Sequence, residues 1–306
     1  MSVLVVGSFV VDCIATCKRA PEAGETVIGD SYNTYLGGKG ANQAFASIRM
    51  GSKTTMVGCV GNDGFGKQFK ETLENEGFDI SYLKTTDKHS TGVSLVTVEH
   101  SGQNRICMTP GANLDYTVND LLEIEELIAN SDVIVTQFEM QYEIAQELVR
   151  LAKKHNKKMI LNPAPARSID DETLNGLYCI TPNETELGII IDRKIETMEE
   201  YIEGAKVLLE KGCLNVIVTL GTKGSLLVNK DGAKLIPAFV VKAIDTVGAG
   251  DSFTGSLSAM IDQGKSLLDA MQIATAVAAL EVQRNGAIPA MPYKEEVYEF
   301  LKQQGL

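Results

Sequence analysis

The 306-residue sequence is short of basic side chains: 28 Lys and Arg residues stand against 40 Asp and Glu residues, which gives a formal net charge of -12 at pH 7. This shortage argues against general nucleic-acid binding, because such proteins carry basic patches. It also means that a polyanionic ligand such as ATP must be received by backbone amides, a metal ion and a few local cations.

Several catalytic and targeting signals are missing as well. The three histidines belong to neither an H-E-x-x-H nor a G-x-S-x-G motif, so hydrolase chemistry built on His has little support. The six cysteines form no C-x-x-C pair, which favours reduced thiols over a zinc site. The start of the chain lacks a basic leader, and its apolar run over 3–15 is interrupted by Asp12 and too short to span a bilayer. We therefore expect a cytoplasmic protein with no membrane partner.

The chain is expected to form three strands before its first long helix. A buried first strand over 2–6 ends at Gly7, but the dinucleotide fingerprint G-x-G-x-x-G does not follow it. Parallel strands need long crossover connections, and these strands lack them. They therefore predict a small separate lid sheet, formed by about 10–36 and 90–110. Its expected strands cover 10–16, 26–36, 91–98 and 105–108.

From residue 119 onward, helical and strand patterns alternate, which indicates a parallel sheet covered by helices. We predict one α/β domain over 1–306: a three-layer, doubly wound, mostly parallel sheet flanked by helices, with the lid sheet attached. Ligands of such sheets bind beyond the carboxyl ends of the strands. The expected elements are helices 119–130, 142–155, 198–211, 267–282 and 294–303, strands 133–137, 158–162, 178–181 and 215–220, and a hairpin over 225–236. Polar or glycine residues placed just after strands are Glu139, Asn162, Asn183 and Gly221.

The stretch I-D-T-V-G-A-G-D-S-F-T-G-S-L over 244–257 is the strongest candidate for chemistry. A strand is expected over 238–244, then a turn at Gly248, Ala249 and Gly250, then a helix with Asp251 in its first turn. The amides of such a turn and the positive helix end make an anion site, and phosphate is the obvious guest. Asp251 could there accept the proton of an attacking hydroxyl. An Asp that merely caps a helix after a glycine turn is an equally good interpretation of this motif alone.

A second glycine-rich stretch, G-G-K-G-A-N-Q-A over 37–44, opens an amphipathic helix. Its glycines permit close approach of the backbone to a ligand, and Asn42 can both donate and accept hydrogen bonds. It is not a Walker A loop, because Lys39 is followed by Gly rather than Ser or Thr. A helix entered through a flexible turn is the alternative.

These two stretches, with N-P-A-P-A over 162–166, T-P-N-E-T-E over 181–186 and T-L-G-T-K-G over 219–224, resemble the ribokinase-like carbohydrate kinases. The resemblance runs in order over essentially the whole chain. It implies an α/β domain with a β-sheet lid, a homodimer joined through the lids, and ATP-dependent phosphorylation of D-ribose at its 5-hydroxyl.

The resemblance also implies roles for individual residues. Asp251 would be the catalytic base, with Gly248, Ala249 and Gly250 as the anion hole. The sugar would contact Asp12, Gly38, Lys39, Gly40, Ala41, Asn42, Glu139 and Asp251. ATP would lie along Asn183, Glu186, Thr219, Leu220, Gly221, Thr222, Lys223, Gly224, Gly250 and Thr275, with Glu186 acting through Mg²⁺ and its waters. A potassium ion would be held by Asp245, Val247, Glu281, Arg284, Gly286 and Ala290.

The chain departs from the family pattern at Val10, where the family usually carries Asn, so one hydroxyl contact is lost or shifted. Thr275 and Ala290 also replace the residues common at their positions. Three alternatives follow: a kinase of this family for another pentose, a ketohexose or a nucleoside; a sugar-binding or regulatory protein without transfer; and, more distantly, a Rossmann dehydrogenase.

Overall fold

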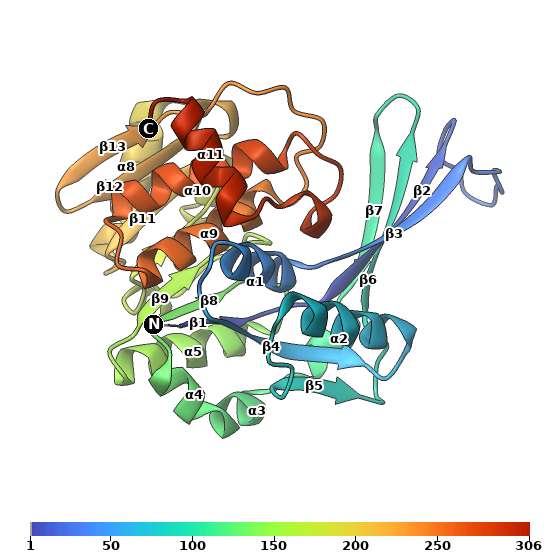
Figure 1. Ribbon diagram of the computed structural model, residues 1–306, viewed down its shortest axis with the longest axis horizontal. Helices are drawn as coiled ribbons and strands as arrows, with labels where there is room; N and C mark the ends of the chain where they lie inside the picture. The colour runs from blue at the N-terminus through green and yellow to red at the C-terminus, as the bar shows by residue number, and fades with distance from the viewer. Residues whose placement is uncertain (1) are drawn as a thin grey trace.

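The computed structural model describes residues 2–306 as a large sheet with helices on both faces and a smaller sheet beside it (Figure 1). The strands of the large sheet are β1 (Val3–Val6), β4 (Thr54–Gly61), β5 (Leu83–Thr86), β8 (Val133–Thr136), β9 (Lys158–Leu161), β10 (Cys179–Ile180), β11 (Asn215–Thr219), β12 (Ser225–Asn229) and β13 (Gly232–Ile236). Their order is β13-β12-β11-β10-β9-β8-β1-β4-β5. Neighbours pair in parallel, except that β12 is antiparallel to both β11 and β13. The predicted fold class is confirmed.

Each face of the large sheet supports its own hydrophobic core. Successive side chains of a strand point to opposite faces, so Val3 and Val5 pack in one core and Leu4 and Val6 in the other. Helices α1 (Lys39–Arg49), α2 (Gly64–Glu76), α9 (Ala249–Asp262), α10 (Leu267–Glu281) and α11 (Lys294–Gln303) cover the first face. Helices α3 (Val118–Glu123), α4 (Glu125–Asn130), α5 (Tyr142–Lys154), α6 (Asp171–Leu174), α7 (Glu184–Ile190) and α8 (Met198–Glu210) cover the second.

The smaller sheet is the predicted lid. It has four strands in the order β3-β2-β6-β7, namely β3 (Ser31–Gly37), β2 (Val10–Cys17), β6 (Gly92–Glu99) and β7 (Asn104–Thr109). Two excursions of the chain meet here, because β2 pairs in parallel with β6. In Figure 1 the lid stands away from the helices that cover the large sheet.

The strand predicted over 238–244 was wrong: this segment is neither strand nor helix, and Val240 is fully exposed. Its apolar character serves helix packing instead, since the rings of Phe239 and Phe300 lie 5.0 Å apart. The end of the segment is held by α10, because the N–H groups of Ile244 and Asp245 donate to the carbonyl of Val282 at 2.7 and 3.2 Å.

Two other boundaries differ from prediction. The strand expected over 26–36 begins only at Ser31, because its pairing with β2 starts there, at Thr16. The helix expected over 119–130 is divided into α3 and α4 at Ile124, whose φ of -104° and ψ of 18° leave the helical range. Strand β5 and helices α6 and α7 were not predicted. Within residues 2–306, no helix combines the length and the apolar character needed to cross a membrane.

Candidate active site

A cavity of about 200 Å³ lies at the carboxyl ends of the parallel strands, where the sequence predicted a ligand site. Residues from five separate sequence motifs meet in it. Its lining consists of Lys39, Asn162, Ala164, Thr181, Asn183, Glu186, Thr219, Thr246, Gly248, Gly250 and Asp251.

The amino end of α9 forms one wall of this cavity. Gly248 precedes the helix with φ 89°, and a Cβ atom there would lie 2.5 Å from Oε1 of Glu281, so only glycine fits. At Gly250 an added Cβ would meet no atom within 4 Å, which leaves its backbone open to the cavity. The first N–H groups of a helix have no intrahelical acceptor, and the positive helix end adds to their attraction for an anion.

Asp251 is the third residue of α9 and is 6% exposed. It does not cap the helix, since Gly248 is the N-cap residue and no side-chain cap bond is present there. Its carboxylate instead accepts two side-chain hydrogen bonds, from Nδ2 of Asn42 at 2.9 Å and from Nε2 of Gln43 at 3.0 Å. The capping interpretation of Asp251 is therefore excluded.

Lys39 lines the same cavity as Asp251 and interacts with its carboxylate electrostatically. The charge of Asp251, followed by those of Glu139 and Glu186, raises the pKa of Lys39 above its ordinary value. The backbone N–H of Lys39 also donates to Glu139 at 2.9 Å, and the hydroxyl of Ser8 donates to the same carboxylate oxygen. One ammonium group thus offsets several carboxylates at the cavity.

The predicted sugar ligands Asp12, Asn42 and Glu139 lie close to one another. Burial raises the pKa of Asp12, and the carboxylates of Glu139 and Asp251 raise it further. A Cβ atom built on Gly37 would lie 3.3 Å from Oδ2 of Asp12 and 3.6 Å from Oδ1 of Asn42. Among the described residues, Oδ1 of Asn42 has no hydrogen-bond partner although it is buried. These oxygens are suited to receive hydroxyl donors.

Of the predicted sugar residues, Lys39 and Asp251 line the cavity, whereas Asp12, Gly38, Gly40, Ala41, Asn42 and Glu139 do not. The methyl group of Ala41 is fully buried in the core, and its N–H donates to the carbonyl of Ser8 at 3.0 Å. A Cβ atom on Gly40 would lie 2.4 Å from the backbone nitrogen of Ser8, so this glycine permits close packing of α1 on the loop after β1. Gly38, with φ 88°, is required by the turn itself.

Asn183 and Glu186 also line the cavity, and they form a reciprocal capping box at the start of α7. Each backbone N–H donates to the other side chain, both at 2.8 Å. Burial raises the pKa of Glu186. Thr219, at the end of β11, bridges to Asn183 across the sheet. The three residues predicted for ATP here therefore line the same wall.

The rest of the predicted nucleotide segment continues outward from this wall, beyond the lining of the cavity. Gly224 turns the chain with φ 106°, and a Cβ atom on it would lie 2.0 Å from the carbonyl oxygen of Ile236. The exposed side chain of Lys223 lies 3.5 Å from Glu184. Thr275 uses its hydroxyl inside α10, donating to the carbonyl of Met271 at 2.8 Å. The remaining predicted residues of this segment are Leu220, which is buried, and Gly221 and Thr222, which are exposed.

The residues predicted for potassium include neighbours of the Gly248 turn, since a Cβ atom on Gly248 would lie 2.5 Å from Oε1 of Glu281. Oδ1 of Asp245 accepts from the N–H of Val247 at 3.0 Å, and Oδ2 accepts from the N–H of Gly286 at 2.9 Å, so this carboxylate ties two loops together. Arg284 turns its side chain to Glu296 at 2.6 Å and also donates to the carbonyl of Ala290 at 3.4 Å.

Glu281 is the unusual member of this group because it is only 1% exposed. Its Oε2 accepts from the hydroxyl of Ser252, whereas Oε1 has no hydrogen-bond partner among the described residues. Burial raises the pKa of Glu281 to about 8, and the carboxylates of Asp251 and Asp245 contribute in the same direction. An orphaned, buried carboxyl oxygen beside a second carboxylate is suited to a cation.

Sequence reasoning missed two glutamines that support Asp251, Gln43 directly and Gln137 through Gln43, and two threonines of the cavity lining. Gln43 and Gln137 are both buried, and Thr181 and Thr246 line the cavity. Gln43 directly follows Asn42 in the second glycine-rich stretch, and Gln137 directly follows β8. The available signals were position within a motif for Gln43 and position after a strand for Gln137.

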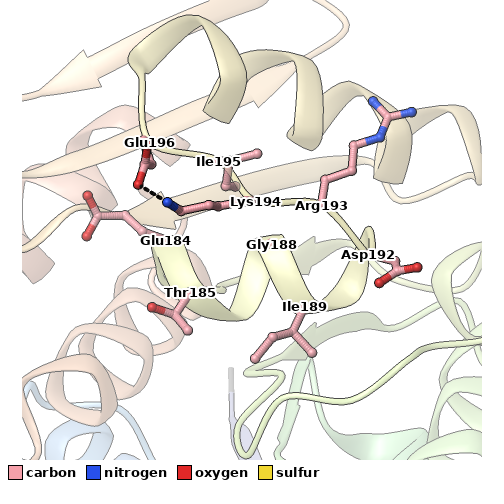
Figure 2. A pocket seen from close by; sticks show the side chains of 9 residues that line it. All are labelled: Glu184, Thr185, Gly188, Ile189, Asp192, Arg193, Lys194, Ile195 and Glu196. Carbon is pink, nitrogen blue, oxygen red and sulfur yellow. Dashed lines mark ion pairs between the residues drawn. The ribbon is translucent and has the colours of Figure 1, made fainter.

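A larger hollow of about 440 Å³ lies beside α7, lined by Glu184, Thr185, Gly188, Ile189, Asp192, Arg193, Lys194, Ile195 and Glu196. Figure 2 shows Lys194 directed to Glu196, with which it pairs at 2.7 Å, while Arg193 points away from that pair. Its polar groups do not converge on one point. The smaller cavity at Asp251 is therefore the candidate active site.

Comparisons with known proteins show which family the chain belongs to. The sequence matches the pfkB family carbohydrate kinase over residues 1–294. It is 35% identical to a ribokinase of Haemophilus influenzae over 298 residues, which cover 97% of each chain. It is also 35% identical to a deoxyribokinase of Salmonella typhimurium over 302 residues, or 98% of this chain and 99% of the relative. The structure of an Arabidopsis thaliana ribokinase complexed with ribose and ATP superposes with a TM-score of 0.92 at 31% identity, covering 98% of each chain.

The doubly wound sheet with its β-sheet lid thus defines a ribokinase-like fold, as the sequence motifs predicted. The chain belongs to the pfkB family of carbohydrate kinases.

Proposed function

We propose that this protein is an ATP-dependent kinase that phosphorylates the 5-hydroxyl of D-ribose and gives D-ribose 5-phosphate. The position of Asp251 carries the proposal: its carboxylate lines the cavity at the amino end of α9, beside the open backbone of Gly250. A base and an anion site therefore face the same small volume. The related ribokinase structure with ribose and ATP supports this choice of substrates.

In the proposed reaction the 5-hydroxyl oxygen attacks the γ-phosphorus. A new O–P bond forms as the bond to the β,γ-bridging oxygen breaks, the hydroxyl proton passes to Asp251, and ADP leaves. The N–H groups of the Gly248–Gly250 turn stabilise the charge on the transferred oxygens. Lys39 stays charged beside Asp251, since its pKa is raised. Its positive charge offsets the repulsion between the carboxylate of Asp251 and the phosphates of ATP.

The sugar hydroxyls would be held by Asp12, Asn42 and Glu139. The unpartnered Oδ1 of Asn42 needs a donor, and a hydroxyl supplies one. Two carboxylates at Asp12 and Glu139 favour a neutral, hydroxyl-rich substrate over an acidic one. This selectivity supports a sugar rather than a sugar acid.

Mg²⁺ would be held by Glu186 through waters and by the phosphate oxygens of ATP. Within residues 2–306 no three His, Cys, Asp or Glu side chains form a metal cage. Magnesium commonly takes one or two carboxylates and fills its remaining positions with water and substrate oxygens, so Glu186 fits it. When bound, the ion neutralises part of the charge of the phosphates.

Potassium would be held next to the Gly248 turn by Asp245, the Val247 carbonyl and the 281–290 loop. The unpartnered Oε1 of Glu281 fits a cation there. When bound, its positive charge helps to fix the amides of the turn for phosphate.

We also propose a homodimer joined through the lids. The lid face that carries Asp12 also carries an apolar lid patch, defined as Ile14, Val96, Ile106 and Met108, because these residues share its register. Ile106 and Met108 are 60% and 40% exposed. An apolar patch of this kind beside a ligand site is typical of an interaction surface.

One other sugar has specific support. The deoxyribokinase relative is as similar as the ribokinase, and Val10 places an apolar side chain two residues before Asp12, on the same face of β2. A sugar that lacks one hydroxyl, such as 2-deoxy-D-ribose, leaves no hydroxyl unpaired there.

Initial rates of ADP release should be measured with D-ribose, 2-deoxy-D-ribose, D-fructose and a nucleoside, in potassium and in sodium. We expect the highest kcat/KM with D-ribose and a higher rate in potassium. A strong preference for fructose or a nucleoside would reject ribose as the substrate. Sugar binding without ADP release would instead identify a non-catalytic protein.

A further inference from the structure

Gln43 lies behind Asp251, out of reach of the cavity. Its side chain is 0% exposed, and it is absent from the lining of the cavity. Nε2 of Gln43 donates to Oδ1 of Asp251 at 3.0 Å and to Oδ1 of Asn162 at 3.3 Å. Its Oε1 accepts from Nε2 of Gln137 at 2.6 Å. One amide therefore joins the amino end of α9 to residues that follow two different strands.

The orientation of the Gln43 amide is set, through Asn162, by the backbone carbonyl of Thr181. The carbonyl of Thr181 can only accept, and Nδ2 of Asn162 donates to it at 3.0 Å. The oxygen of Asn162 must then face Gln43. Turning the Gln43 amide around would place its oxygen against the oxygens of both Asn162 and Asp251, so only one orientation satisfies the network.

We infer that Gln43 is a positioning residue for Asp251, with Gln137 as its support. This inference rests on the proposed function, in which Asp251 is the base. Asn42 holds one carboxylate oxygen and Gln43 holds the other, so the carboxylate plane is fixed by two donors. In the proposed function Asn42 also contacts the sugar, through its unpartnered Oδ1, so its bond to Asp251 can change when a hydroxyl arrives. The Gln43 bond lies on the protected side and keeps the carboxylate in place.

Gln43→Met tests this role because methionine matches the length of glutamine but donates no hydrogen bond. We expect kcat to fall by about tenfold to a hundredfold, since small displacements of reacting groups have effects of this size. The KM values for sugar and ATP should change much less, because Gln43 touches neither. Gln146→Met is the matched control: Gln146 is exposed and bonds Asp170, away from the cavity.

A double variant separates positioning from general damage. If Gln43 acts through Asp251, adding Gln43→Met to Asp251→Asn should lower kcat little further. The same fold-loss in both backgrounds would overturn the inference. Gln137→Met removes only the outer support, so it should give a smaller loss of kcat in the same direction. It keeps the test available if Gln43→Met does not fold.

Crystal structures of the wild-type protein and of either variant supply a readout that does not depend on turnover. We expect one Asp251 rotamer in the wild type and a displaced or divided carboxylate in the variant. An unchanged, single rotamer in the variant would reject the positioning role. Absence of kinase activity in the wild type would reject the proposed function. The crystal structures would still show whether Gln43 fixes the rotamer of Asp251.

Discussion

Asn42 and Asp251 lie 209 residues apart in the sequence, yet the side-chain amide of Asn42 donates a 2.9 Å hydrogen bond to the carboxylate of Asp251. The bond joins the first turns of α1 and α9, two helices that share one core on the same face of the sheet. Each helix is entered through a glycine turn, so two turns that are distant in the chain form one site. The base therefore exists in place only when both ends of the chain have folded together.

Asp251→Asn should retain ATP binding and lose turnover by about a hundredfold to ten-thousandfold. The substitution keeps the shape of the side chain but removes the proton acceptor. ADP release and ATP titration calorimetry measure the two effects separately. Asp231→Asn, on an exposed turn, serves as the control. Near-normal turnover would show that Asp251 is not the base.

The two glycines that flank Ala249 should respond differently to alanine. Gly248→Ala should lower the free energy of unfolding by about 1–2 kcal/mol or more, because its φ is 89° and the new Cβ would contact Glu281. The free energy of unfolding of Gly250→Ala should be within about 1 kcal/mol of the wild-type value, since the new Cβ atom would meet no atom within 4 Å. Its turnover should still fall more than about tenfold, because the methyl group enters the anion site. Denaturant titration and initial rates check the pair, and equal stability losses would contradict the assignment.

Glu281 predicts a specific dependence of stability on pH. Its pKa in the folded protein is about 8, above the ordinary 4.5, so the folded state keeps a proton that the unfolded state loses. The corresponding stability is fully present below about pH 4.5 and is lost as the pH rises toward 8, on the order of 1 kcal/mol per pH unit. Glu281→Gln should remove this slope in a buffer free of potassium and sodium. Denaturant titrations between pH 5 and 8, against the exposed control Glu299→Gln, measure it, and an unchanged slope would contradict the burial argument.

The effect of added potassium on the pH dependence of stability is an independent test of the role of Glu281. A cation beside Glu281 favours its charged form, so potassium chloride should flatten the slope of the wild type. The Glu281→Gln variant should not respond in this way. An identical response of both proteins would place the cation elsewhere.

Much of the site could be predicted because glycine turns and strand ends leave local signals. The turn at Gly248 and the position of Asp251 in the first turn of a helix follow from the spacing of glycines and apolar residues alone. The meeting of Asn162 and Asn183 follows from the alternation of helices and strands, because the carboxyl ends of parallel strands share one edge. Glu139 and Gly221, predicted at the same edge, do not line the cavity.

The burial of polar side chains had no local signal. A glutamine on a helix, such as Gln43, has the composition of a solvent-facing residue, and its burial depends on α9, which is more than 200 residues away. The burial of Glu281 likewise depends on the turn at Gly248 packing over it. The segment 238–244 was mistaken for a strand because its apolar residues suit a sheet, whereas Phe239 packs on a ring of α11.

The apolar lid patch predicts the oligomeric state. Ile106→Lys places a charge in this patch and should convert the proposed dimer to a monomer, because an ammonium group would be costly to bury there. Leu95→Lys is the matched control, since Leu95 is 56% exposed but lies on the opposite face of the lid. Light scattering after size-exclusion chromatography distinguishes the two. Dissociation by Leu95→Lys alone would move the interface to the other face.

Val10 predicts how the enzyme divides its preference between sugars. Val10 is 4% exposed and follows the same face of β2 as Asp12, so its side chain offers no partner to a hydroxyl near that carboxylate. Val10→Asn supplies a donor and an acceptor, and one neutral hydrogen bond is worth about 0.5–1.5 kcal/mol, or roughly twofold to tenfold. The ratio of kcat/KM for D-ribose to that for 2-deoxy-D-ribose should rise by this factor. Val98→Asn, farther out on the same lid face, should leave the ratio unchanged. A rise with both sugars equally would show that position 10 affects the lid as a whole rather than one hydroxyl.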